Sequence, residues 1–114
     1  MSELDDVGRS LMDFVRDGVL ADMNHILAGT AKAPELQDLS AAAIANPDQD
    51  MLQTLVRQSV DDTIHHLLWW LEQPDCPVRL MTRDGRDLAE ISDGLPGELY
   101  SDRGWIARFS KAVA

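Results

Sequence analysis

Apolar residues recur at steps of three and four from residue 3 to residue 28, which is the pattern of an amphipathic helix. Ser2 is placed to cap this helix, with Asp5 three residues later. Gly8 and Gly18 fall inside the pattern, and each weakens a helix by about 1 kcal/mol relative to alanine. We expect one apolar stripe to face the core: Leu4, Val7, Leu11, Phe14, Val15, Val19, Met23 and Ile26.

Two more helices follow with the same periodicity. One is predicted over residues 34–45, because proline is favoured at a first helical position. A longer one is predicted over residues 47–73, with Asn46 as its cap and Pro47 as its first residue. Two stripes are expected to be buried: Leu36, Leu39, Ala43 and Ile44 on the shorter helix, and Leu52, Val56, Val60, Ile64, Leu67, Trp70 and Leu71 on the longer one.

The period then changes from that of a helix to that of a strand. Short alternating runs flank Asp84-Gly85, a dipeptide typical of tight hairpin turns, and they predict a β-hairpin over about residues 78–91. A glycine-rich loop follows. A terminal helix is predicted over about residues 102–112, with three residues facing inward: Trp105, Ile106 and Phe109.

These elements predict a mainly α fold, a single-domain bundle of three to four helices with a small C-terminal β-hairpin over residues 1–114. The chain has 45% hydrophobic and 26% charged residues, an ordinary globular mixture. Its N-terminus is acidic rather than basic, and no apolar run is long enough to span a membrane. The lone Cys76 cannot form an internal disulfide, so we expect a cytoplasmic protein.

The charge distribution indicates the kind of partner. Asp and Glu number 20 against 10 Lys and Arg, for a net charge of −10. Residues 1–75 hold fourteen acids and four bases, which gives −10, and residues 76–114 hold six of each, which gives zero. Such a field repels nucleic acid and anionic membranes and attracts a basic protein. The alternative is that the acids only maintain solubility.

The stretch SVDDTIHHLLWWLEQ, residues 59–73, carries most of the candidate chemistry. Adjacent helical residues diverge by about 100°, so His65 and His66 cannot easily bind one metal together. Each instead follows an aspartate by four residues, in the pairs Asp61–His65 and Asp62–His66. A metal site would need a further ligand such as Glu72 or His25. We expect no metal and no cofactor, and interpret the pairs as solvated groups or as part of a partner-binding face.

Trp69 falls on the polar side of the same helix, and tryptophan is enriched among binding hot spots. Burial beneath the hairpin or the last helix is the alternative. The loop SDGLPGELYSDRGW is a second candidate for recognition, or else only a tight path into the last helix. The partner-binding residues predicted from these features are Asp61, Asp62, His65, Trp69, Asp93 and Glu98.

The segments VDDTIHHLLWWLEQ and ISDGLPGELYSDRGWIARFSK resemble small immunity proteins that are encoded beside bacterial competition toxins. The resemblance spans roughly residues 52–112 and lies in size, acidity and segment pattern. It implies a cytoplasmic, non-enzymatic protein that binds one toxin domain and occludes its active site. Two other classes stay open: an adaptor or regulatory subunit for another basic protein, and a helical metal-dependent hydrolase that uses Asp61, His65 and Glu72.

Overall fold

The computed structural model describes residues 2–112, and within them the chain is mainly helical, as the periodicity predicts. A π-helical stretch, η1, joins the first two α-helices, and a 3-10 turn, η2, precedes the last one. The elements are α1 (Glu3–Ser10), η1 (Leu11–Arg16), α2 (Asp17–Leu27), α3 (Pro34–Ala45), α4 (Gln49–Leu71), α5 (Leu88–Ile91), η2 (Pro96–Leu99) and α6 (Trp105–Phe109).

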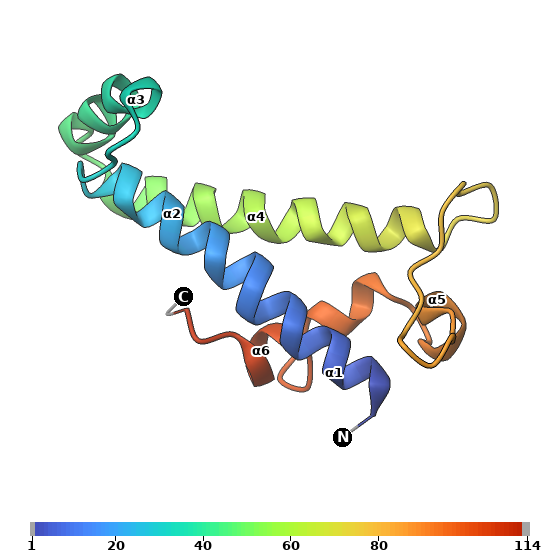
Figure 1. Cartoon of the computed structure of the whole chain (residues 1–114). Coiled ribbons are helices and arrows are strands. Elements are labelled where there is room, and N and C mark those ends of the chain that lie inside the picture. Colours follow the sequence, from blue (N-terminus) through green and yellow to red (C-terminus); the bar gives the residue numbers. More distant parts are fainter. Residues whose placement is uncertain (1, 113–114) are drawn as a thin grey trace.

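Two long helical rods meet near one end of the molecule and diverge towards the other end (Figure 1). One rod is α1, η1 and α2 in continuation, and the other is α4; α3 lies at the end where the rods meet. The segments α5, η2 and α6 lie along the opposite half of the rods. The molecule measures 47 × 30 × 21 Å, and its radius of gyration is 16.4 Å. A compact chain of this length would have about 13 Å, so the fold is open rather than spherical.

The helix starts follow local capping chemistry. The Ser2 hydroxyl accepts a hydrogen bond from the Asp5 backbone N–H at 3.0 Å, as predicted. The cap of α4 is Asp48 rather than the predicted Asn46, and its carboxylate accepts from the Met51 N–H at 3.0 Å. Asn46 instead accepts from the Asp48 N–H, so it shapes the turn that precedes the helix.

The predicted β-hairpin is wrong. Gly85 does make the turn, with φ +80°, but within the described residues the flanking runs form only one isolated bridge, between Met81 and Asp87. The Asp87 carboxylate accepts a hydrogen bond from the Ala89 N–H and caps α5. The residues after Asp87 are therefore helical, where the prediction had placed the second strand. A two-stranded hairpin is marginal without a face to bury, and Leu80 and Met81 remain exposed.

The terminal helix is shorter than the predicted 102–112. It covers Trp105–Phe109, because Ser101 takes a positive φ of 71° and the backbone becomes extended again at Ser110. The inward position of Trp105 is confirmed, since its side chain is completely buried. Phe109 is half-buried, and the guanidinium groups of Arg9 and Arg108 lie over its ring, 4.9 and 4.6 Å from the ring centroid.

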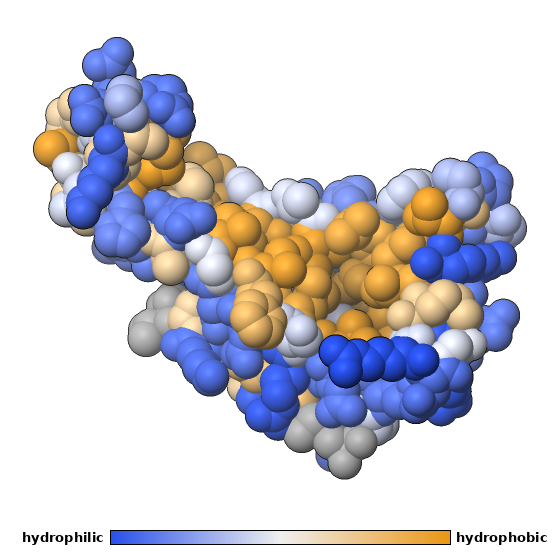
Figure 2. Space-filling model, in the orientation of Figure 1, coloured by the Kyte–Doolittle hydropathy of each residue, from blue (hydrophilic) through white to orange (hydrophobic). Residues whose placement is uncertain are grey.

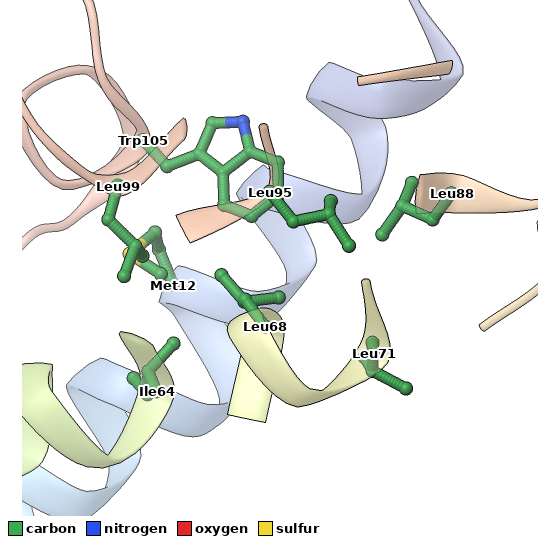
Figure 3. Packing of buried hydrophobic residues seen from close by; sticks show 8 residues of the cluster. All are labelled: Met12, Ile64, Leu68, Leu71, Leu88, Leu95, Leu99 and Trp105. Carbon is green, nitrogen blue, oxygen red and sulfur yellow. The ribbon is translucent and has the colours of Figure 1, made fainter. Parts of the chain in front are cut away.

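The core lies where the two rods meet the C-terminal segments (Figure 3). Its buried side chains are Met12, Ile64, Leu68, Leu71, Leu88, Leu95, Leu99 and Trp105. The indole of Trp105 rests against Gly8, where any Cβ would collide with the ring. The glycine that weakened the helix in the sequence pattern therefore makes room for the largest core residue.

The first rod buries only part of the stripe that its sequence predicts. Ile26 is buried, and Leu4, Val7 and Leu11 pack against the core. In the middle of the rod the buried residues are Met12, Arg16 and Leu20, spaced by four residues. Phe14 is 81% exposed, and Val15 and Val19 are exposed as well. The π-helical turn of η1 lies at this point and changes the register between the two halves of the rod. The prediction that Phe14, Val15 and Val19 face the core is wrong.

Candidate functional site

The face of α4 that the fold buries is displaced from its apolar stripe. The buried residues are Ile64, Leu68 and Leu71, and their side of the helix also carries Asp61. Leu67 and Trp70, which were predicted to be buried, are 46% and 39% exposed. Since a helix turns by about 100° per residue, the rest of the fold buries the border between the apolar and polar sides of α4 and leaves part of its apolar side exposed.

The short helix α3 shows the same displacement. Leu39 and Ile44 were predicted to face inward, but both are exposed. The residue that α3 buries is Ser40, whose hydroxyl donates to the Ile26 carbonyl at 2.6 Å. This hydrogen bond fixes α3 against the end of α2.

The open apolar sides of the two rods face each other across a groove of about 400 Å³. Its walls are almost entirely aliphatic, and Figure 2 shows a continuous apolar area between α4 and the first rod. The sequence pattern assigned to the core all three of the lining residues from the first rod and three of the six from α4. The lining residues are Val15, Val19 and Met23 from the first rod, and Leu55, Val56, Ser59, Val60, Thr63 and Ile64 from α4.

The two polar residues of this groove offer little to a ligand. The Ser59 hydroxyl donates to the Leu55 carbonyl at 2.7 Å, and the Thr63 hydroxyl donates to the Ser59 carbonyl at 2.8 Å. Both donors are therefore engaged within α4. The groove can bind apolar side chains but is poorly suited to a polar substrate.

A second hollow, of about 850 Å³, lies between α2, the start of α4 and the C-terminal segment. Its lining mixes charges of both signs, including Asp17, Arg57 and Lys111, with amide and aliphatic side chains. The groove differs from this hollow in its uniform apolar character.

The structure separates the two acid–histidine pairs predicted on α4. Asp61 does not pair with His65; its carboxylate binds Arg16, with distances of 2.6 Å to Nε and 3.2 Å to the second terminal nitrogen. Asp62 does pair with His66, at 3.4 Å between Oδ1 and Nδ1, and both side chains are largely exposed. Asp61 is thus held inside the fold, whereas Asp62 faces solvent.

His65 contacts the segment after η2 rather than an acid. Its Nδ1 lies 3.2 Å from the Tyr100 hydroxyl, and the two rings are 5.7 Å apart. Burial raises the pKa of Tyr100 above 10.0, and the nearby carboxylates of Asp61 and Asp62 raise it further. The phenol therefore stays protonated at neutral pH and can donate to the imidazole.

The remaining predicted binding residues lie on different parts of the surface. Trp69 is 51% exposed, so neither the residue 78–91 segment nor α6 covers it. Glu98 is half-buried and accepts from the Ser92 hydroxyl at 3.2 Å, while Asp93 is exposed. The structure brings Asp62 and Trp69 onto the exposed side of α4 and places the two loop acids near η2.

The residues considered as metal ligands serve other contacts. Glu72 accepts from the Leu95 backbone N–H at 2.9 Å, and His25 bonds Thr30 at the end of α2. Among residues 2–112, no group of three His, Cys, Asp or Glu side chains has the geometry to hold a metal ion.

The groove was missed because each stripe was assumed to be buried. A clue was present in the first rod, where Met12, Arg16 and Leu20 repeat at steps of four beside the predicted stripe. That second row contains an arginine, so it did not qualify as an apolar pattern.

Comparisons of the chain with protein-family models, with curated proteins and with solved structures find no match. None of the helices within residues 2–112 is both long enough and apolar enough to cross a bilayer.

Proposed function

We propose that this protein is an immunity protein, which binds a basic toxin domain and inhibits it by covering its active site. The observation that carries the proposal is the groove between the rods, where two helices leave apolar stripes open to a partner. Contiguous apolar surface of this kind is typical of sites of protein–protein interaction. The function is binding, and no catalytic step is assigned to the chain.

Charge supports the same proposal. The net charge of −10 would speed the approach of a basic domain and favour its correct orientation. Asp62 and Trp69 lie on the exposed side of α4, where they offer a partner an acid and a large aromatic ring. Acidic steering with apolar anchoring suits a tight inhibitor of a nuclease-like target.

An adaptor that binds some other basic protein would use the same surface. The two functions differ in what the partner does when it is free. A toxin kills the cell that makes it, whereas the partner of an adaptor does not.

The test is co-expression with the product of the adjacent gene. That product is induced alone, with this protein, and with its Trp69→Ala variant, and surviving colonies are counted. Immunity predicts killing by the neighbour alone and survival when this protein is present. A neighbour that is harmless alone, or that kills equally in both strains, would contradict the proposal.

A further inference from the structure

We propose that the groove between the rods receives one amphipathic helix of the partner, with apolar residues on one side and Lys or Arg on the other. This inference rests on the proposed function and specifies the element that would occupy its binding surface. It follows from the hydrogen-bonding capacity of the walls, from their length and from the charge around them.

The hydrogen-bonding capacity of the walls favours a helix over an extended segment. An extended peptide leaves its backbone N–H and C=O groups in need of partners. The groove provides aliphatic side chains and two hydroxyls, and those hydroxyls already donate to carbonyls of α4. A helix satisfies its own backbone, so it can bury its apolar side here at no cost in unpaired polar groups.

The length of the walls sets the size of the occupant. One wall runs from Val15 to Met23, and the other from Leu55 to Ile64. At about 1.5 Å per residue, each wall is roughly 12–14 Å long, or about two and a half turns. Such a groove accommodates three anchors spaced by three or four residues along one helix.

Charge favours a basic partner over a second copy of this chain. Asp22 follows the lining residue Val19 by three positions, and Asp62 follows Ser59 by three, so each acid neighbours a groove residue on its helix surface, and both acids are exposed. A symmetric dimer through the groove would bring these acids together between two chains of net charge −10 each. Lysine or arginine beside the anchors would instead complement them.

The experiment uses a synthetic helix as the probe. The peptide has about twenty residues, with leucine at positions i, i+3, i+4 and i+7 and lysine and alanine elsewhere, a length above the limit of about 15 residues below which isolated helices are marginal in water. One control peptide replaces lysine by glutamate, and another has the same composition in scrambled order. Binding to the intact protein is measured by calorimetry, and sedimentation reports the oligomeric state of the protein alone.

Matched variants locate the binding site. Leu55 lines the groove and is 57% exposed, whereas Leu39 lies outside it on α3 and is 53% exposed. We expect Leu55→Gln to weaken binding of the basic peptide about tenfold or more and Leu39→Gln to leave it unchanged. Val19→Gln on the opposite wall should act like Leu55→Gln, and thermal melts verify that each variant is folded.

Each alternative result overturns the inference. Equal effects of Leu55→Gln and Leu39→Gln would place the peptide elsewhere, and equal binding of the scrambled or acidic peptide would refute the proposed chemistry. A dimer that Leu55→Gln dissociates would make a second copy the occupant. The peptide measurements need no toxin, so failure here leaves the co-expression result standing, and a harmless neighbour leaves the peptide result standing.

Discussion

Arg16 and Asp61, 45 residues apart in the sequence, form a two-point ion pair that connects the rods. Nε and the second terminal nitrogen of Arg16 donate to the two carboxylate oxygens of Asp61, at 2.6 and 3.2 Å. Only 2% of the Arg16 side chain is exposed, and 15% of that of Asp61. The third nitrogen donates to Ser110, whose hydroxyl donates to Asp17. One buried cation thereby joins the first rod, α4 and the C-terminal segment.

The neighbouring aspartates of α4 should therefore differ in their effect on stability. Asp61→Asn leaves the buried Arg16 with only the more distant carboxylate of Asp17, 4.0 Å away, as counter-ion, which should cost about 3 kcal/mol in the free energy of unfolding. Asp62→Asn removes an exposed carboxylate paired only with His66, and should change that free energy by about 0.5 kcal/mol or less. Urea unfolding of both variants measures the difference, and equal effects would show that the Arg16 pair is unimportant.

The two glycines of the first rod should respond in opposite directions to alanine. A Cβ at Gly8 would collide with the indole of Trp105, whereas nothing lies within 4 Å of a Cβ at Gly18. We expect Gly8→Ala to destabilise the protein despite its better helix propensity. Gly18→Ala should stabilise it by up to about 1 kcal/mol. Thermal unfolding would contradict this packing if Gly8→Ala raised the melting temperature.

Acid should loosen the contacts between the start of α1 and the C-terminal half. A hydrogen bond from Arg108 lowers the pKa of Asp5 below 3.8, and one with Thr82, aided by Arg86, lowers the pKa of Glu3 below 4.5. Both depressed values mean that the fold favours the ionised form. The two carboxylates stabilise the fold fully at pH values above their ordinary pKa in the unfolded chain. This stabilisation is lost as the pH falls through their lower pKa in the folded protein.

This pH dependence can be isolated with one variant. Asp5→Asn cannot ionise, so the stability difference between wild type and this variant should shrink between neutral pH and pH values below 3.8. Unfolding curves at several pH values give that difference. A difference that stays constant with pH would mean that the Asp5–Arg108 contact does not contribute.

Substitution of two different acids should show whether charge near the groove or the overall net charge speeds association with the partner. Asp62→Lys and Asp38→Lys change the net charge equally, but Asp62 is one helical turn from the groove residue Ser59, whereas Asp38 lies on α3. We expect Asp62→Lys to slow association with the partner more, and the difference to shrink at high salt. Stopped-flow measurements test this, and equal slowing would mean that only the overall charge matters.

Sequence periodicity predicted the three long helices well because their local chemistry is consistent. Pro34 starts α3 as expected, and Ser2 caps the first rod. The hairpin failed because Asp87 is an effective helix cap, and pairing of two short strands could not compete with it. Local pattern cannot rank such alternatives, since the outcome depends on which surface each segment can bury.

The inward face of each helix was harder to predict. Arg16 belongs to the buried side only because Asp61 and Ser110 surround its guanidinium, and both come from distant parts of the chain. The loop after α5 likewise looked like a recognition segment, yet it supplies Leu95 and Leu99 to the core, both fully buried. Of the candidate site, the exposed position of Asp62 agreed with the helical pattern, whereas the groove depends on how the two rods are placed relative to each other.

The central claim is that this protein inhibits a partner by binding it, and a titration of purified proteins tests this most directly. The product of the adjacent gene is titrated with this protein while the heat of binding and the partner's toxic activity are followed together. The account predicts saturation at equimolar ratio, with the activity lost at the same point. Absence of binding, or binding that leaves the activity intact, would contradict it.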